Sequence, residues 1–201
     1  MLERTGLIQR FKEETTAAHA GVDQMVSGYN PFSDKKNYGK FLQIQEIFHR
    51  IVDKTYHNKL LNEKIPGLEK LARHDRVKND MKTLGVEEYA VENLPELNDL
   101  DESLGWLYCA EGSNIGAALL LKGAEQLGFS AEKGASHLAP HPNGRKKFWH
   151  EFLEQYKKAV EGWVDEDKVI QGAKNAFSFY AGLAQQVFSL SLIHISEPTR
   201  Q

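Results

Sequence analysis

Apolar residues recur along most of this chain at intervals of three and four positions, which is the spacing of one face of an α-helix. No stretch shows the sustained alternation of apolar and polar residues that is typical of a β-strand. A first helix is predicted over residues 7–26, with the inward positions Ile8, Phe11, Thr15, Ala18, Val22 and Val26. A second, longer helix is predicted over about 34–57, with the inward positions Tyr38, Phe41, Ile44, Ile47, Phe48, Ile51 and Val52.

Glycine, proline and capping residues predict where the helices begin and end. Gly28 ends the first helix, and Ser33 or Asp34 caps the second. A further piece after the second helix is broken by Pro66-Gly67. The remaining helices are predicted at 75–84, at 101–128 with Asp101 or Ser103 as its start, at 145–163 and at 165–188. The sequence therefore predicts a compact, single-domain, all-α fold of seven or eight helices.

The composition narrows the class of protein. With 201 residues, of which 41% are hydrophobic, the chain is long enough for one core of ordinary size. The formal net charge of -3 excludes a polycation that binds nucleic acid by charge alone. Cys109 is the only cysteine, so no disulfide and no cysteine metal cluster can form within the chain. No apolar run is long enough to span a bilayer, and the N-terminus lacks the apolar core of a signal peptide, so we expect a cytoplasmic protein.

The last residues, LSLIHISEPTRQ at 190–201, break with the helical pattern before them. They resemble the in-frame translation of a transposase adaptor that is used to prepare sequencing libraries. We therefore predict one domain over residues 1–189 and an artefactual or disordered tail over 190–201. The tail is left out of the fold prediction.

His19 lies at the edge of the apolar face of the first predicted helix, and Asp23 follows it one turn later. At this spacing the carboxylate can accept a hydrogen bond from one imidazole nitrogen, which leaves the other nitrogen to bind a metal. A histidine at the margin of a core gives the same pattern. His19 is therefore a candidate metal ligand, and a core-edge histidine is the alternative.

Two glycines interrupt the helix predicted at 101–128, within the string YCAEGSNIGAALLL at 108–121. Each mid-helix glycine costs roughly 0.8–1 kcal/mol relative to alanine. Gly112 and Gly116 are four positions apart, so they share one helix face and strip it of side chains. This pattern indicates either close packing against another helix or a bent, bare stretch of backbone on which a planar macrocycle can lie.

The residues around these positions resemble those of bacterial heme oxygenases. The matching strings are TTAAH at 15–19 with Asp23, GWLYCAEGSNIGAA at 105–118, and His137-Leu138-Ala139, Asn143-Gly144-Arg145 and Trp149 further on. The resemblance covers essentially residues 7–188. It implies the heme-oxygenase-like fold, with heme b as both cofactor and substrate between the first helix and the glycine-interrupted helix. It also implies that O2 and external electrons open heme to biliverdin, carbon monoxide and ferrous iron.

The resemblance further implies a role for each site residue. His19 would be the proximal ligand of the heme iron, and Asp23 would orient it. The distal residues, which shape the space over the heme or hold its ordered water, would be Gly112, Gly116, Ser113, Asn114 and Arg145. A surface ion pair is the alternative role for Arg145.

Two residues bear on which meso carbon of heme is attacked. In relatives, a lysine and a tyrosine at the positions of Lys12 and Tyr108 hold the anionic propionates for cleavage at the α-meso carbon. Relatives that give β and δ products carry a lysine at the position of Gly123, which this chain lacks. The resemblance therefore implies α-biliverdin. A solvated helix face is the alternative role for Lys12.

Other functions stay open at this stage. A heme carrier with the same pocket and no turnover is one alternative. A heme-free, thiaminase-like hydrolase with Cys109 as nucleophile is another, although a small buried residue is the simpler interpretation of this cysteine. A single Glu46-x-x-His49 is short of the pair that a di-iron bundle needs, so His49 is expected at the surface or core edge. His137 and His141 are expected in a loop, as weak candidate metal ligands. His57, His74 and His150 are expected in solvent.

The resemblance implies two partners, heme and an electron-donor reductase of the ferredoxin or flavin type. A basic cluster could form a docking surface for an acidic donor, and it consists of Arg10, Lys12, Lys35 and Lys36. A solvated helix face is the alternative for this cluster. We expect a monomer that binds neither nucleic acid nor membrane.

Overall fold

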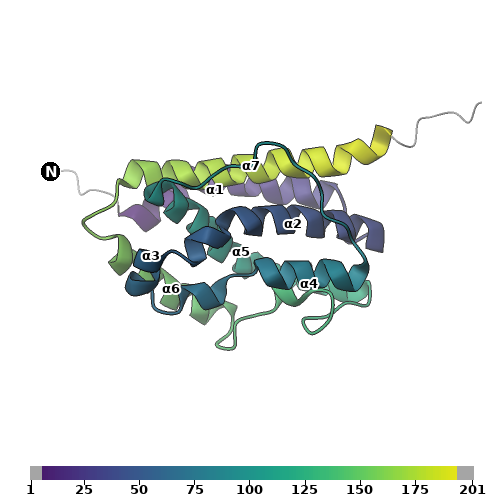
Figure 1. The fold of residues 1–201 in the computed structure, drawn as a ribbon, viewed down its shortest axis with the longest axis horizontal. Helices are drawn as coiled ribbons and strands as arrows, with labels where there is room; N and C mark the ends of the chain where they lie inside the picture. Colours follow the sequence, from purple (N-terminus) through teal and green to yellow (C-terminus); the bar gives the residue numbers. More distant parts are fainter. Residues whose placement is uncertain (1–5, 194–201) are drawn as a thin grey trace, which may run out of the picture.

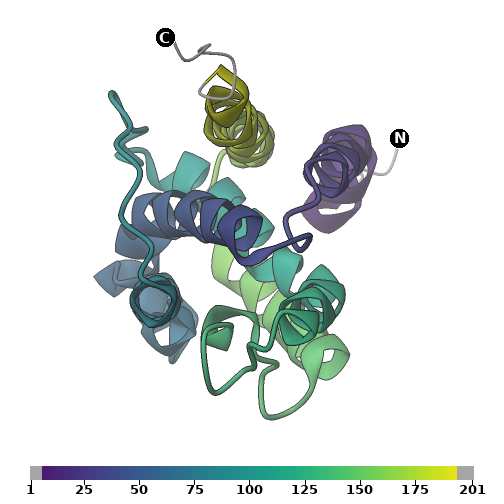
Figure 2. The same ribbon diagram turned by 90° about the vertical axis from the view of Figure 1, so that its right-hand side faces the viewer.

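The computed structural model describes residues 6–193, with side chains through residue 189. Its elements are α1 (Leu7–Gly28), α2 (Lys35–Tyr56), α3 (Lys59–Lys64), the short 3-10 helix η1 (Leu68–Leu71), α4 (His74–Leu84), α5 (Leu100–Gln126), the 3-10 helix η2 (Ser136–Leu138), α6 (Arg145–Val160) and α7 (Glu166–Ile193). Figures 1 and 2 show α1 and α7 along one edge of the molecule, α2 and α5 through its middle, and α4 and α6 along the opposite edge. The predicted all-α architecture is confirmed.

The ends of α2 and α4 follow from local chemistry as predicted. The carboxylate of Asp34 accepts a hydrogen bond from the backbone N–H of Asn37 at 2.8 Å and so caps α2. Gly85 ends α4 with a φ of 67°, a left-handed conformation that glycine adopts without steric cost.

The predicted start of α5 is wrong by a few residues. Asp99, rather than Asp101 or Ser103, is the N-cap, because its carboxylate accepts from the backbone N–H of Asp101 at 2.9 Å and of Glu102 at 3.3 Å. Ser103 is already inside the helix, where its hydroxyl donates to the carbonyl of Asp99 at 2.8 Å. Asp99, Asp101 and Ser103 are all common N-cap residue types, so which of them caps α5 depends on the tertiary packing of this segment.

The last two helices also end at other places than predicted. α6 stops at Val160 instead of Trp163, because Gly162 takes a φ of 80° in the turn that follows. α7 continues to Ile193, past the predicted end of the helix at residue 188 and the predicted end of the domain at residue 189. Residues 194–201 lie outside the described part of the chain, so the nature of the tail stays a prediction.

α5 and α7 form the closest helix pair of the fold, and two glycines make this approach feasible. A Cβ added to Gly105 would lie 2.1 Å from the carbonyl oxygen of Val169. A Cβ added to Gly172 would lie 2.2 Å from the carbonyl oxygen of Glu102. Backbone therefore lies on backbone at this crossing, which anchors α5 in the centre of the main core.

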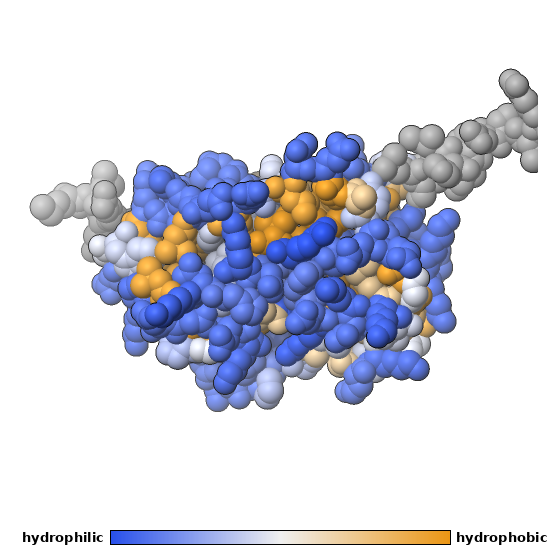
Figure 3. Space-filling view, in the orientation of Figure 1, coloured by the Kyte–Doolittle hydropathy of each residue, from blue (hydrophilic) through white to orange (hydrophobic). Residues whose placement is uncertain are grey.

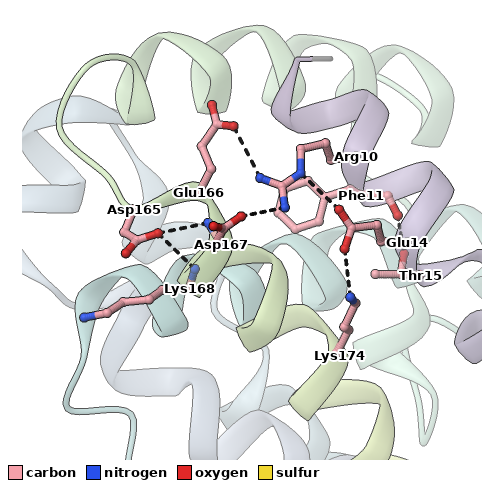
Figure 4. A network of polar contacts seen from close by, with 9 residues as sticks. All are labelled: Arg10, Phe11, Glu14, Thr15, Asp165, Glu166, Asp167, Lys168 and Lys174. Atoms are coloured by element: carbon pink, nitrogen blue, oxygen red, sulfur yellow. Dashed lines mark hydrogen bonds and ion pairs between the residues drawn. The ribbon is translucent and has the colours of Figure 1, made fainter. Parts of the chain in front are cut away.

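α1 packs mainly on α7, and a network of charged side chains joins the two helices (Figure 4). Arg10 donates to Asp167 at 2.8 Å and lies 3.6 Å from a carboxylate oxygen of Glu166. Lys174 reaches back from α7 to Glu14 at 2.8 Å. These contacts hold the first half of α1 along the start of α7.

The apolar side chains form two clusters. The larger lies between α1, α2, α5, α6 and α7, and the smaller lies between α2, α4, α5 and the segment at 129–138. On the face drawn in Figure 3, small apolar patches are set in a largely hydrophilic surface. Within residues 6–193, no helix has the length and apolar character needed to cross a membrane.

Candidate functional site

His19 lies in the middle of α1 with its imidazole in solvent. The side chain is 59% exposed, and Nδ1 lies 3.5 Å from a carboxylate oxygen of Asp23. The ring of Phe177 on α7 meets the imidazole edge-on, with 5.7 Å between ring centroids. An imidazole that is open to solvent on one side and contacts Phe177 on the other fits both a metal ligand and a core-edge histidine. Nδ1 faces the carboxylate of Asp23, so Nε2 is the ring nitrogen that points away from this carboxylate.

α5 contacts the start of α1 at one place and the segment just after α1 at another, and His19 lies between these two places along the chain. At the first place, Phe11 stacks on Tyr108 with 3.8 Å between ring centroids. At the second, the ring of Phe32, just after α1, covers Gly123 so closely that a Cβ there would lie 2.5 Å from it. The stretch of α5 between Tyr108 and Gly123 therefore lies opposite the middle of α1.

This stretch of α5 presents an uncovered face. A Cβ added to Gly116 would meet no atom of residues 6–193 within 4 Å. Ile115 and Leu119, on the same face, are the exposed large apolar residues of α5, and Leu119 is 74% exposed. We call the four residues Gly112, Ile115, Gly116 and Leu119 the bare face of α5. An exposed apolar stripe of this kind marks a site for an apolar ligand.

The two glycines of this face serve different purposes. Gly112 lies under the indole of Trp149, whose Cη2 would be 3.4 Å from an added Cβ, whereas Gly116 faces open space. Gly112 therefore lies against a side chain of α6, whereas Gly116 contacts no described helix in this way; the contact of backbone on backbone is made by Gly105 and Gly172. Neither Gly112 nor Gly116 has a positive φ. Close helix packing therefore describes Gly112, and a bare stretch of backbone describes Gly116.

An exposed imidazole on α1 and a bare apolar face on α5 suit a flat, apolar, metal-containing ligand. The sequence model of the family described as heme oxygenase matches residues 5–186. The chain belongs to the heme oxygenase family. It is 31% identical to heme oxygenase PigA of Pseudomonas aeruginosa over 183 residues, and this aligned region covers 90% of this chain and 92% of that protein. It also superposes on the crystal structure of the NO- and CO-bound heme oxygenase of Neisseria meningitidis with a TM-score of 0.87, at 44% identity and 92% coverage of both chains.

This chain is thus a heme oxygenase, an enzyme whose substrate and cofactor is heme. The predicted distal residues Ser113 and Asn114 follow Gly112 directly. The hydroxyl of Ser113 donates to the carbonyl of Ala110 at 2.7 Å, and the amide of Asn114 donates to Glu111 at 3.3 Å. Both side chains therefore bond within α5 itself.

Arg145, the first residue of α6, is bound to backbone and not to a surface carboxylate. Its guanidinium donates to the carbonyl of Asn114 at 3.1 Å and to the carbonyl of Leu138 at 2.6 Å. Burial, together with the nearby charge of Arg73, lowers its pKa. The side chain of Arg145 thus connects α6 with α5 and with the segment before α6.

Lys12 and Tyr108 lie at the same end of the site. Lys12 is exposed and directly follows Phe11, the residue that stacks on Tyr108. Tyr108 is half-buried, also lies against Trp149 at 5.3 Å between ring centroids, and has its pKa raised by burial to about 12. The phenol therefore stays protonated at neutral pH and can donate a hydrogen bond to an anion.

The sequence reasoning missed a buried polar network behind the bare face. Glu111 is 1% exposed, and its carboxylate accepts from the hydroxyl of Tyr56 at 2.5 Å and from the guanidinium of Arg73 at 2.7 Å. Arg73 also donates to the carbonyl of Ala110 at 3.3 Å. A signal was present, because a carboxylate in an otherwise apolar helix must find partners if it is buried. The sequence could not say which partners.

His57 and His150 are exposed, as expected, whereas three other histidines are placed differently from the expectations. His49 is buried in the core rather than at the surface or core edge, and burial lowers its pKa. His74 is not simply solvated, because Nε2 lies 2.8 Å from the buried carboxylate of Glu46. His137 is buried with Nδ1 at 2.8 Å from Asp80. Among the described residues, no three His, Cys, Asp or Glu side chains gather as a metal site.

Cys109 and Arg10 both have partners that bear on the alternative sites. The thiol of Cys109 donates to the carbonyl of Ala173 at 3.6 Å, and burial raises its pKa, so the thiolate that a nucleophile needs is disfavoured. In the basic cluster, Arg10 is engaged by carboxylates of α1 and α7. Lys35 lies over the ring of Phe129 at 5.6 Å. Arg10 therefore does not offer a free charge to a docking partner.

Proposed function

We propose that this heme oxygenase opens heme to biliverdin, carbon monoxide and ferrous iron, with O2 and externally supplied electrons as co-substrates. The observation that carries the proposal is the exposed imidazole of His19 opposite the bare face of α5. When bound, heme supplies the redox chemistry, and the protein supplies the axial ligand, the geometry and the hydrogen bonds.

His19 is the proximal ligand in this proposal. Asp23 fixes the tautomer by accepting from Nδ1, which presents Nε2 to the iron and raises the basicity of the ring. The edge of the Phe177 ring limits rotation of the imidazole from the side of α7. All three residues lie on one side of the heme.

The bare face of α5 covers the opposite side. Gly116 lets the backbone approach a flat ring closely, and Ile115 and Leu119 offer it apolar contact. Ser113 and Asn114, held against α5 by their own hydrogen bonds, keep polar atoms near this side, where water that delivers protons can bind. Bulky acids and bases are kept away from the reacting edge.

The product in this proposal is α-biliverdin. Lys12 and the protonated hydroxyl of Tyr108 lie at one end of the site and hold the propionates there. At the other end, the ring of Phe32 closes over Gly123, so a lysine at this position would have to displace an aromatic ring. A heme rotated toward that end would therefore find no lysine at position 123 to bind its propionates.

Titration of the purified protein with hemin tests the ligand. We expect a saturable one-to-one complex with the absorption spectrum of histidine-ligated heme. His19→Ala should abolish the proximal nitrogen signature in resonance Raman spectra. The matched control is His57→Ala, because His57 is also exposed and has Asp53 one turn away with Nδ1 3.4 Å from its carboxylate. An unchanged signature in His19→Ala, or its loss in both variants, overturns the assignment.

Turnover of the hemin complex with ascorbate or a reductase tests the reaction and its product. The Soret band should disappear, and chromatography should show α-biliverdin. Lys12→Ala should shift the product toward other isomers or change the NMR hyperfine pattern, whereas Lys36→Ala, an exposed lysine outside the site, should change neither. A stable Soret band under reducing conditions overturns the proposed reaction, and an unchanged product in Lys12→Ala removes Lys12 from the site.

The proposal extends to the partners and the compartment. Electrons come from a reductase of the ferredoxin or flavin type, because the reaction consumes electrons from outside. The protein acts as a monomer in the cytoplasm, which the single cysteine supports, since disulfides are typical of oxidising compartments. Sedimentation of the hemin complex at several concentrations checks the monomer, and a mass that rises to that of a dimer contradicts it.

A further inference from the structure

Two backbone carbonyls of α5 accept hydrogen bonds from arginines of other elements. Arg73, at the N-cap of α4, donates to the carbonyl of Ala110 at 3.3 Å. Arg145, at the start of α6, donates to the carbonyl of Asn114 at 3.1 Å. The two carbonyls are one turn apart, and each lies two residues before one of the glycines of the bare face. α5 is thus tied from outside just where it carries little side-chain packing.

A buried counter-ion makes this arrangement possible. Arg73 and Glu111 are almost fully buried, and the guanidinium lies 2.7 Å from the carboxylate. Burial alone would lower the pKa of Arg73, but the charge of Glu111 and the contacts with Glu111 and Tyr56 together outweigh burial and raise the pKa. The hydroxyl of Tyr56, at the end of α2, donates to the same carboxylate. Breaking such a buried pair by removing one partner is strongly destabilising, so the two charges stay together.

The external donors compete with the hydrogen bonds of the helix itself. In a regular α-helix the carbonyl of Ala110 accepts from the N–H four residues later. Here it also receives the hydroxyl of Ser113 at 2.7 Å and the guanidinium of Arg73, although a carbonyl oxygen has only two lone pairs. Side chains that insert into the hydrogen-bond ladder are a recognised cause of helix bending. The arginines therefore set the path of the backbone through the glycines.

We propose that Arg73, with Glu111 as its buried counter-ion, and Arg145 are positioning residues that fix the distance of the bare face of α5 from the heme. We call this set of hydrogen bonds the carbonyl clamp. The place of the heme in this inference rests on the proposed function, whereas the clamp itself is a property of the protein without heme. The clamp acts through the backbone and touches neither substrate nor iron.

Hydrogen exchange of the heme-free protein tests the clamp directly. Arg73→Lys keeps the charge next to Glu111 but cannot span both the carboxylate and the carbonyl of Ala110. We expect the backbone amides at 112–118 to exchange at least about tenfold faster, while the amides at 104–108 in the same helix keep their rates. The matched control is Arg50→Lys, because Arg50 lies beside the buried Glu46, at 3.5 Å, on α2. The control should leave α5 unchanged.

Arg145→Met keeps the test decisive if Arg73→Lys fails to fold, because Arg145 is only half-buried and the Arg73–Glu111 pair stays intact. It should accelerate exchange at 114–118. With hemin bound, both variants should change the carbon monoxide stretching band and the ratio of biliverdin isomers. Uniform acceleration over α5, or unchanged exchange at 112–118 in both variants, overturns the clamp. Failure of the unmodified protein to bind hemin through His19 refutes the proposed function instead, and leaves the exchange result standing.

Discussion

Three glycines of α5 have three different surroundings, and alanine should affect each one differently. A Cβ on Gly105 would lie 2.1 Å from the carbonyl oxygen of Val169. On Gly112 it would lie 3.4 Å from Trp149, and on Gly116 it would meet nothing within 4 Å among the described residues. Alanine is the better helix former by roughly 0.8–1 kcal/mol at every one of these positions. The surroundings of each glycine therefore decide whether alanine raises or lowers the free energy of unfolding.

Gly116→Ala should gain the full propensity difference of about 0.8–1 kcal/mol, which corresponds to a rise in Tm of roughly 2–4 °C for a chain of this size. Gly112→Ala should gain somewhat less, because the methyl group reaches ordinary contact with the indole. Gly105→Ala should destabilise the fold by more than about 3 kcal/mol, because backbone atoms cannot rotate out of the way and α5 must move off α7.

Thermal unfolding of the heme-free variants by circular dichroism measures these changes, and hemin titration measures the effect on function. We expect Gly116→Leu to leave the heme-free fold stable yet to weaken hemin binding at least about tenfold, because its side chain fills the space that the bare face leaves open. Gly105→Ala should lose both fold and binding. If Gly116→Ala destabilised the protein as much as Gly105→Ala, or if Gly116→Leu bound hemin normally, the assignment of the bare face would be refuted.

Three further predictions concern charge and protonation. Lys174→Met removes the ion pair with Glu14 and should cost about 0.5 kcal/mol, because the pair is partly exposed; it should also accelerate hemin dissociation, measured by transfer to apomyoglobin, whereas Lys157→Met, which breaks an ion pair within α6, should not. The thiol of Cys109 should react with a thiol reagent at neutral pH only when the protein unfolds, and rapid labelling of the native protein would contradict its placement. The contribution of the Tyr108 phenol to the free energy of unfolding should be fully present below pH 10 and should be lost as the pH rises toward 12, because burial raises the pKa of Tyr108 to about 12 while the unfolded phenol ionises near 10. Equal midpoints of urea unfolding at several alkaline pH values would contradict this.

Local chemistry in the sequence was sufficient to predict the helices and several of their ends. The spacing of apolar residues identified the segments, since a helix in a globular protein must bury one face. Asp34 and Gly85 act on their own neighbours in the chain, so their effects could be predicted. The start of α5 could not, because Asp99 and Asp101 are both good caps and Lys168 of α7 pairs with Asp99 at 2.9 Å.

The candidate site was predictable only where its features are local. His19 and Asp23 lie one turn apart on one helix, so their contact follows from helical geometry. The environment of His49 does not follow from its sequence neighbours, because its burial depends on how α2 packs. The same holds for Glu111, whose partners come from residues far away in the chain.

The sequence by itself determined an all-α chain, a histidine–aspartate pair on one helix and a helix that carries glycines where a good helix former would be expected. The tertiary structure decided which glycine serves which purpose: Gly105 admits α7, Gly112 lies under an indole, and Gly116 is open. It also decided that arginines at the starts of α4 and α6 hold the carbonyls of α5. The reason is physical, because hydrogen bonds along a helix depend on residues a few positions apart, whereas the space beside a Cα depends on which distant segment is packed there.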